Sequence, residues 1–286
     1  MLYFSPLELI LKAKQKKVAL GSFNVFNIEM FHAVTIAASK KKSPVIIATG
    51  EVDIQYFPPE FAVSLMKIYS KKFDIPFILH LDHCTQVELA EKCLRYGYSS
   101  IMFDGSQLPY EENVEKTRSV VKIAQWFGVP VEGELGVILG THEFFESAAQ
   151  KDIQLKITDP EAARDFVLRT GIHTLAPSIG SAHGVYVEKP KIHFDTLKRI
   201  SEVTHIPLVL HGGSGIPVED VHRCLEDGVA KVNVGTDIRR TLVDTIAHEG
   251  INSYVEARTI MEKSRDAIVT VVENWLDILK SPVILQ

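Results

Sequence analysis

Short apolar runs recur along this chain at fairly even intervals, and they restrict its fold more than any other feature. Four of them start at a proline, where the missing N–H matters little: SPVIIATG from Ser43, IPFILHLDH from Ile75, VPVEGELG from Val129 and IPLVLHGG from Ile206. Near-continuous apolar runs of this length are typical of parallel strands buried on both faces. Four more runs complete the series: VALGSFNV from Val18, SSIMFDG from Ser99, AKVNVG from Ala230 and, with an internal proline, HTLAPSIG from His173.

The segments between the runs space their apolar residues three and four positions apart, which predicts helices. The clearest cover residues 28–41, 86–96, 110–127, 160–169 and 218–227, and glycines follow several of their ends. Strand and helix alternate eight times, at roughly 30 residues per unit. This pattern predicts an α/β fold, a single (β/α)8 TIM barrel, with a doubly wound open sheet as the alternative.

Two segments lie outside the repeat. Residues 254–280 carry an apolar face at helical spacing, which predicts a C-terminal helical extension that packs on the barrel or on a partner subunit. Residues 136–156 form a long polar connection after the fifth strand, as functional lids often do. The whole chain, residues 1–286, is expected to form one domain, because barrels of this type reach that length.

Charge and cysteine usage exclude several classes of protein. The chain has 31 Lys and Arg against 36 Asp and Glu, a net charge of −5, so a surface for nucleic acid is not expected. Cys84, Cys93 and Cys224 form an odd set with no CxxC pair, which indicates a reducing compartment. The N-terminus lacks the order of a secretory signal and no run approaches a membrane span, so we expect a cytoplasmic protein.

Three histidines stand at or just after predicted strand ends. His83 ends the third strand in HLDH, His183 follows the sixth in GSAHG, and His211 ends the seventh in LHGGSG. Strand ends of a barrel meet at one mouth, and three imidazoles are the ligand set of an open zinc site. We interpret the remaining histidines, His80 among them, as surface or core residues, and leave His142 in the long connection open.

Carboxylates accompany these histidines at the same strand ends. Asp82 precedes His83 and is interpreted as a general base or as a residue that orients a metal ligand. Glu134 in EGELG and Asp104 in FDGS are either alternative metal ligands or hydrogen-bonding neighbours. Cys84 is expected to open a helix and to have a structural role.

Glycine-rich turns follow the seventh and eighth strands, as GGSG (residues 212–215) and NVGTD (residues 233–237). Such turns at helix N-termini bind phosphate in barrel enzymes, and Ser214 and Thr236 add hydroxyl donors. A metal that polarises a carbonyl, a carboxylate base and a phosphate site together favour carbon–carbon cleavage through an enediolate. Metal-assisted hydrolysis is the chemical competitor.

Six motifs resemble the class II, zinc-dependent fructose/tagatose-bisphosphate aldolases. They are LHLDH, FDGSQLPYEENV, EGELG, SIGSAHGVY, PLVLHGGSGIP and KVNVGTD, within about residues 23–237. The resemblance implies reversible cleavage of a phosphorylated ketose into dihydroxyacetone phosphate and an aldehyde. It also implies a homodimer or homotetramer with one Zn²⁺ per chain, and leaves room for a monovalent cation near the phosphate.

The resemblance also assigns residues. It makes His83, His183 and His211 the zinc ligands and Asp82 the acid/base for the C4 hydroxyl proton. Glu134 and Asp104 match carboxylates that hold the metal in alternative positions. The residues matching dihydroxyacetone-phosphate contacts are Gly184, Gly212, Gly213, Ser214, Asn233, Val234, Gly235 and Thr236.

Departures from the family pattern affect the substrate. Gly50 stands where relatives carry a hydroxyl residue, and Glu262 falls where bisphosphate-cleaving relatives place an arginine. The long connection reads GVILGTHEFFE, so its proton shuttle must be His142, Glu143 or Glu146. We therefore expect the dihydroxyacetone-phosphate half to be retained and the aldehyde half to differ from glyceraldehyde 3-phosphate.

A second class of function is a non-catalytic partner subunit of a tagatose-bisphosphate aldolase. Such a partner is expected to lose metal ligands. This chain retains all three histidines and Asp82, which favours the enzyme.

Overall fold

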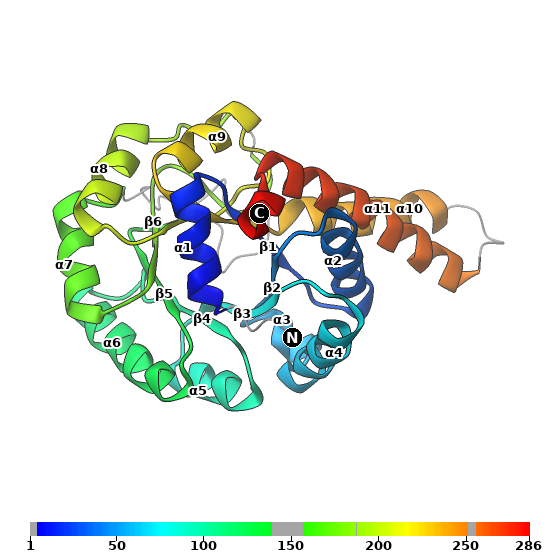
Figure 1. Cartoon of the computed structure of the whole chain (residues 1–286), viewed down its shortest axis with the longest axis horizontal. Coiled ribbons are helices and arrows are strands. Elements are labelled where there is room, and N and C mark those ends of the chain that lie inside the picture. The colour runs from blue at the N-terminus through cyan, green and yellow to red at the C-terminus, as the bar shows by residue number, and fades with distance from the viewer. Residues whose placement is uncertain (1–4, 139–156, 187, 251–255) are drawn as a thin grey trace.

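A computed structural model of the chain describes residues 5–138, 157–186, 188–250 and 256–286. Eight parallel strands close into a barrel in chain order, and helices surround it (Figure 1). The strands are β1 (Leu20–Asn24), β2 (Val45–Gly50), β3 (Phe77–Cys84), β4 (Ser100–Phe103), β5 (Val131–Leu135), β6 (Thr174–Pro177), β7 (Leu208–Leu210) and β8 (Val229–Val234). The predicted (β/α)8 barrel is confirmed, including the strand that contains Pro177.

The helices follow the strands around the barrel wall. They are α1 (Pro6–Lys16), α2 (Ile28–Lys41), α3 (Asp53–Tyr56), α4 (Pro59–Lys72), α5 (Val87–Tyr96), α6 (Tyr110–Phe127), α7 (Pro160–Thr170), α8 (Phe194–Thr204), α9 (Val218–Glu226), α10 (Thr236–Gly250), α11 (Ala257–Ile278) and the 3₁₀ helix η1 (Ser281–Leu285). The sequence patterns located α2, α5, α6, α7 and α9 to within about one residue, the usual uncertainty of helix ends. They did not single out α1, α3, α4 and α8.

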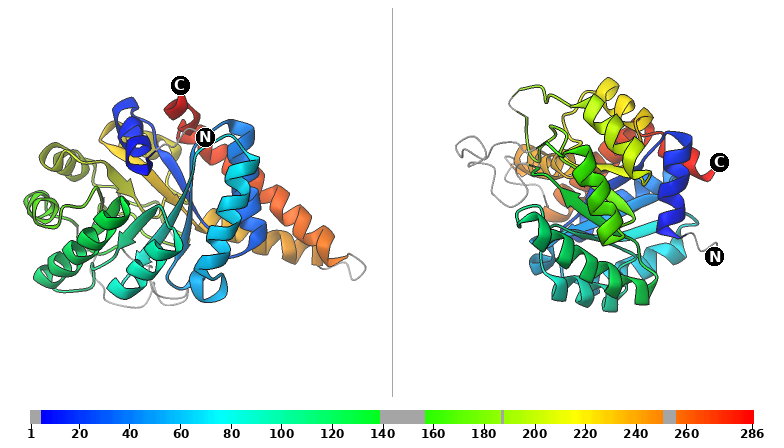
Figure 2. Two further views of the ribbon diagram at one scale, coloured as in Figure 1. Left: turned by 60° about the horizontal axis from the view of Figure 1, so that its bottom comes forward. Right: turned by 90° about the vertical axis from the view of Figure 1, so that its left-hand side faces the viewer.

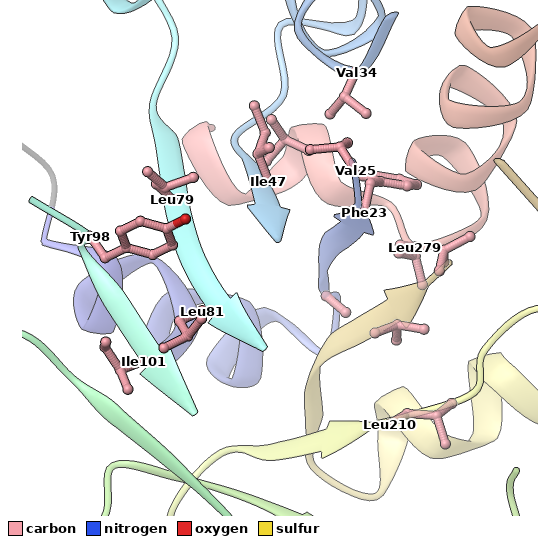
Figure 3. Packing of buried hydrophobic residues seen from close by; sticks show 14 of the residues in the cluster. Phe23, Val25, Val34, Ile47, Leu79, Leu81, Tyr98, Ile101, Leu210 and Leu279 are labelled. Carbon is pink, nitrogen blue, oxygen red and sulfur yellow. The ribbon is translucent and has the colours of Figure 1, made fainter. Parts of the chain in front are cut away.

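Side chains that alternate along each strand separate the outer core from the barrel interior. On β3, Leu79 and Leu81 join the apolar layer between the strands and the helices, whereas His80 and Asp82 point into the barrel. Figure 3 shows part of this apolar layer: β1 packs against α11 and β2 against α2, while β3 packs against α4 and α5. The strands therefore bury both faces, the outer one against apolar side chains and, on β3, the inner one against polar side chains.

Helix α1 covers the N-terminal end of the barrel, across the opening that faces the viewer in Figure 1. Its first position is Pro6, and the Glu8 carboxylate accepts a hydrogen bond from the backbone N–H of Ser5. Leu9 and Ile10 are buried in a separate small apolar cluster with the first residues of β1, β2, β3 and β8. A functional site in the barrel is therefore expected at the opposite end, where the strands terminate.

The predicted C-terminal extension is α11, which is one long helix followed by η1. It packs against α2 and runs beside α10, and the pair projects from the barrel in both Figure 1 and Figure 2. Trp275 of α11 donates from its indole Nε1 to the Asp237 carboxylate, 2.8 Å away, at the start of α10. The extension is thus anchored to the loop that follows β8.

Two smaller expectations about the chain can be compared with the structure. Cys84 does not open a helix but ends β3, because α5 starts three residues later; its buried thiol donates to the Gln86 carbonyl. Most of the long connection, residues 139–156, lies outside the described residues. No helix in the described ranges is long and apolar enough to cross a membrane.

We predict that α1 contributes to stability through its buried face. Leu9→Ala removes a fully buried side chain, which should lower the free energy of unfolding by about 2–5 kcal/mol. Leu11→Ala on the same helix is the matched control, because Leu11 is 47% exposed and its loss should change the value by less than about 0.5 kcal/mol. Urea unfolding measures both, and equal losses would contradict the role given to Leu9.

Candidate active site and metal centre

The C-terminal end of β3 presents two consecutive functional side chains to the barrel mouth. A regular strand would direct Asp82 and His83 to opposite faces. The pairing of β3 with β4 shifts register between Leu81 and Cys84, and His83 adopts a left-handed backbone with φ +46°. This irregularity allows both Asp82 and His83 to face the same site.

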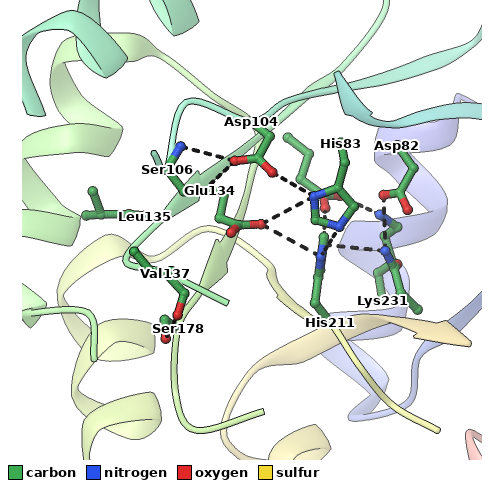
Figure 4. Close-up of polar contacts among 12 residues, drawn as sticks. Asp82, His83, Asp104, Ser106, Glu134, Leu135, Val137, Ser178, His211 and Lys231 are labelled. Carbon is green, nitrogen blue, oxygen red and sulfur yellow. Dashed lines mark hydrogen bonds and ion pairs between the residues drawn. The ribbon is translucent and has the colours of Figure 1, made fainter. Parts of the chain in front are cut away.

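The three predicted histidines come together at this mouth (Figure 4 labels two of them). The ring centroid of His83 lies 4.8 Å from that of His183 and 4.7 Å from that of His211. Each of the three offers a ring nitrogen, and these nitrogens lie within 4.8 Å of one another. The geometry therefore brings together the three imidazoles that the sequence placed on separate strands.

Carboxylates on the far side of two rings fix which nitrogens face the centre. His83 Nδ1 lies 2.8 Å from Asp104 Oδ2, and His211 Nε2 lies 2.9 Å from Glu132 Oε1. The nitrogens opposite these, His83 Nε2 and His211 Nδ1, lie 3.0 Å apart, so without a metal one of them carries a proton that the other accepts. With a metal bound, the carboxylates would hold the protons on His83 Nδ1 and His211 Nε2 and leave both facing nitrogens as lone-pair donors.

The donor set fits a metal ion. His183 Nε2 and both carboxylate oxygens of Glu134 are buried and lack a hydrogen-bond partner within the described part of the chain. Glu134 Oε2 lies 3.7 Å from His83 Nδ1 and 3.8 Å from His211 Nδ1. Buried groups of this kind normally have a partner, so their convergence points to a bound cation.

The electrostatics of the centre favour positive charge. Burial opposes charge on His83, but the Asp82 and Asp104 carboxylates outweigh it and raise the pKa of His83 to about 9. Burial, reinforced by the charge of Asp104, raises the pKa of Glu134 well above its usual range. Burial and the neighbouring histidines lower the pKa of His183 well below its usual range, so that its ring is neutral, as a metal ligand requires.

Asp104 and Glu134 occupy different positions around the histidines. Asp104 Oδ1 accepts hydrogen bonds from the backbone N–H and the hydroxyl of Ser106, at 3.0 and 2.6 Å, and its other oxygen holds His83. Asp104 is therefore a hydrogen-bonding neighbour of the centre in this structure. Glu134 lacks such bonds and remains a candidate ligand.

Asp82 lies beside the metal centre, held by two asparagines. Its Oδ2 accepts from Asn24 Nδ2 at 2.7 Å, and its Oδ1 accepts from Asn233 Nδ2 at 3.1 Å. Burial alone would raise the pKa of Asp82, but positive charge on His83 and the contact with His80 outweigh it and hold the pKa well below its usual range. Asp82 is thus an ionised carboxylate that can accept a proton.

The loops after β6, β7 and β8 pack backbone against backbone around the predicted phosphate site. Gly212 has φ +65°, and a Cβ there would lie 2.0 Å from the Ala182 carbonyl oxygen. A Cβ on Gly213 would lie 2.9 Å from the Asn233 carbonyl oxygen, which accepts the N–H of Gly213 at 2.9 Å. Only glycine permits this approach.

Other predicted contact residues line the same region. The Ser214 hydroxyl accepts from the backbone N–H of Asp237 at 3.1 Å, so the loop after β7 adjoins the start of α10, where Thr236 lies. Gly235 passes beside the Asn24 side chain. The Val234 side chain is buried in the outer core, which leaves only its backbone for a ligand.

Gly184 follows His183 directly, with φ +98°. Asn233, predicted as a substrate contact, reaches Asp82 as described above, while its Oδ1 is buried without a partner in the described ranges. The proposed shuttles His142, Glu143 and Glu146 lie outside the described residues.

Sequence reasoning missed several polar residues of the site: Asn24, Asp53, Glu132, Lys231 and Arg239. Three of these interrupt otherwise apolar strands, so a signal was present in the alternation of polar and apolar residues. Asp53 and Arg239 lie on helices, and nothing in the sequence pattern pairs them.

Comparisons with known proteins agree with this geometry. The model of the family "Fructose-bisphosphate aldolase class-II" matches residues 5–282. A sulfofructosephosphate aldolase of Alkalicoccus urumqiensis is 39% identical over 239 residues, 84% of this chain and 82% of that protein. The D-tagatose-1,6-bisphosphate aldolase subunit GatY of Klebsiella oxytoca is 35% identical over 280 residues, 97% of this chain and 98% of that protein.

Among solved structures, the crystal structure of the YdjI aldolase from Escherichia coli K12 superposes with a TM-score of 0.85. It is 31% identical, and the match covers 96% of each chain. These matches extend over nearly the whole chain, and the side chains at the barrel mouth include groups that could bind a metal, as this metal-dependent family requires. The chain therefore belongs to the class II fructose-bisphosphate aldolase family, whose members are carbon–carbon lyases acting on phosphorylated sugars.

Proposed function

We propose that this protein is a zinc-dependent aldolase that cleaves a ketose 1-phosphate into dihydroxyacetone phosphate and an aldehyde. The observation that carries the proposal is the convergence of His83, His183 and His211, with two of the rings oriented by carboxylates. The same retention of ligands speaks against a non-catalytic partner subunit. Assembly as a cytoplasmic homo-oligomer stays a prediction.

The residues of the mouth divide the reaction among them. A zinc ion held by the three histidines would polarise the substrate carbonyl. Asp82, ionised and fixed by Asn24 and Asn233, accepts the proton of the C4 hydroxyl as the C3–C4 bond breaks, and returns it in the aldol direction. Ser214 and the start of α10 hold the phosphate at C1.

Next to Asp82, the mouth presents the Asp53 carboxylate, an anion that does not suit the binding of a second phosphate. Gly50 pairs with Asp82 in the β2–β3 register, and a Cβ on Gly50 would lie 3.1 Å from Asp53 Oδ2. The Asp53 carboxylate therefore stands where a side chain at position 50 would lie. It accepts a hydrogen bond from the Gly50 N–H at 3.0 Å, and as an anion it repels a phosphate.

Arg239, the cation beside Asp53, is paired with it. Arg239 Nη2 donates to both oxygens of Asp53, at 3.1 and 2.9 Å. On α11, Glu262 is exposed and makes no hydrogen bond or ion pair with any described residue. The three nearby cations of α11 each face a carboxylate: Arg258 faces Glu256, Lys263 faces Glu249 and Arg265 faces Asp266.

The substrate named by relatives does not decide this point, since similar proteins carry names with different sugars. The paired state of Arg239 instead supports an aldehyde half without a phosphate, whose hydroxyls can donate hydrogen bonds to the Asp53 carboxylate.

We predict that His183→Ala abolishes zinc binding and all measurable aldolase activity while the barrel still folds. His183 Nε2 has no hydrogen-bond partner in the described structure, so alanine breaks no bond of the metal-free fold. Elemental analysis, circular dichroism and an aldol assay measure the outcome. His248→Ala is the control, because that side chain is 86% exposed and should retain metal and activity. Stoichiometric zinc in His183→Ala would overturn the ligand assignment.

Asp82→Ala is expected to retain zinc and to lower kcat by roughly 10²–10⁴, the usual effect of removing a general acid/base. Asp82→Asn keeps the shape of the side chain but cannot accept a proton, so it should lose a similar factor. An Asp82→Asn variant with the kcat of the parent would reassign Asp82 to orientation of its neighbours.

For the substrate, kcat/KM should be higher for a ketose 1-monophosphate than for fructose or tagatose 1,6-bisphosphate. Asp53→Asn removes the repelling charge and leaves Arg239 without its anionic partner, so it should shift the ratio toward the bisphosphates by about 10- to 100-fold, the value of one charge-assisted hydrogen bond. Asp244→Asn, which alters an exposed aspartate facing Arg240 at 3.9 Å on α10, is the control and should leave the ratio unchanged. A parent enzyme that prefers either bisphosphate would contradict the idea.

A further inference from the structure

A chain of buried polar side chains lies inside the barrel beneath the metal centre. Lys231 Nζ of β8 donates to Glu132 Oε2 at 2.7 Å and to His80 Nε2 at 3.2 Å. All three residues are at most 2% exposed. Figure 4 shows Lys231 between Asp82 and His211, so the lysine lies among residues of the proposed site without being a ligand or a base itself.

The hydrogen-bonding capacity of lysine fixes the direction of every bond in this chain. An ammonium group only donates, so His80 Nε2 accepts, and the proton of His80 must be on Nδ1. That nitrogen lies 2.7 Å from the Ser100 hydroxyl, which accepts it. On the other branch, Glu132 uses Oε2 for Lys231 and its second oxygen, Oε1, for the proton on His211 Nε2.

His80, which bonds to Lys231, also lies close to the proposed proton acceptor, Asp82. His80 Nε2 lies 3.7 Å from Asp82 Oδ1, and Asn233 Nδ2 of β8 donates to Asp82 Oδ1 at 3.1 Å and lies 3.4 Å from His211 Nε2. Lys231 and Asn233 are two residues apart on one strand, so both point into the barrel. Asp82 therefore lies next to the buried group formed by Lys231, His80 and Glu132, whereas His211 is bonded to that group, through Glu132.

His80, Asp82 and Glu132 together resemble an ion site, because their ligand atoms lie within 4.8 Å of one another. Lys231 Nζ bonds to two of these three residues, Glu132 and His80. A fixed ammonium thus supplies the positive charge that this group of acceptors needs, and it does so whether or not a metal is present.

We propose that Lys231 is a positioning residue of this enzyme: through Glu132 it fixes the His211 ring with Nδ1 toward the metal centre. The proposal rests on the proposed metal site, and it adds that the ligand geometry is established in the metal-free protein by a buried lysine. Residues that orient metal ligands typically contribute roughly 10- to 100-fold to metal affinity.

The first test uses the unmutated protein without metal. Nitrogen-15 spectra of labelled histidine should show His80 protonated on Nδ1 and His211 protonated on Nε2. The opposite tautomer at either ring would overturn the proposal, because Lys231 and Glu132 could not then hold the bonds described. This readout does not depend on metal binding or on catalysis, so it separates the inference from the proposed function.

The second test measures zinc affinity by competition with a chromophoric chelator. Lys231→Met, similar in length and without charge, should lower the affinity roughly 10- to 100-fold and mix the two tautomers of His211. Tyr98→Phe is the matched control: it breaks a buried 2.8 Å hydrogen bond to Thr49 in the barrel wall, away from the lysine, and should keep the parent affinity.

Glu132→Gln provides an independent variant if Lys231→Met fails to fold. Its amide retains the size of the glutamate but cannot accept from both Lys231 and His211, so zinc affinity should fall by a similar factor. Parent zinc affinity in a folded Lys231→Met or Glu132→Gln variant would overturn the proposal.

Discussion

The pair formed by Lys231 and Glu132 is the interaction on which the barrel interior depends. TIM-barrel interiors are usually filled by layers of branched apolar side chains. Here the middle of the barrel holds a lysine, a glutamate and a histidine, all buried. An ion this deep is strongly unfavourable unless it is paired and its remaining hydrogen-bonding groups are satisfied. The 2.7 Å contact and the bonds to His80 and His211 meet that condition.

The polar interior supports the proposed metal centre, which lies next to it at the barrel mouth. The metal centre requires imidazoles whose free nitrogens face one point, and an imidazole turns unless its other nitrogen is held. An apolar layer beneath His211 would offer no acceptor for its Nε2 proton. The apolar residues that close the barrel are instead concentrated at its N-terminal end, where Leu9 and Ile10 of α1 pack against the strand starts.

The sequence predicted the barrel and the mouth because both follow from local rules. Proline-headed apolar runs at even spacing indicate parallel strands, and strand ends in a barrel meet at one mouth, so His83, His183 and His211 could be placed together before any coordinates. Long-range pairings were not accessible in this way. Lys231 and Glu132 are 99 residues apart, and each reads as an isolated polar residue in an apolar strand.

Helix α1 was missed for a related reason. Its apolar face is short, and its role becomes visible only when the starts of β1, β2, β3 and β8 are brought together. The irregular end of β3 was also invisible in the sequence: nothing in LHLDH shows that His83 adopts a left-handed backbone. That local feature decides that Asp82 and His83 share one site.

The site combines a rigid interior with a more adaptable rim, and this division explains how one family can act on different sugars. Within the interior, Lys231 bonds to Glu132 and Asn233 bonds to Asp82, so a change at one member of either pair leaves a buried group unpaired. On the rim, the Arg239 side chain is 38% exposed, pairs with Asp53 and lies over the Phe26 ring. Substitution of Arg239 or Asp53 can alter the charge presented to the aldehyde half, because water can replace the lost ion-pair partner at this partly exposed position. Specificity can therefore change without disturbing the metal centre.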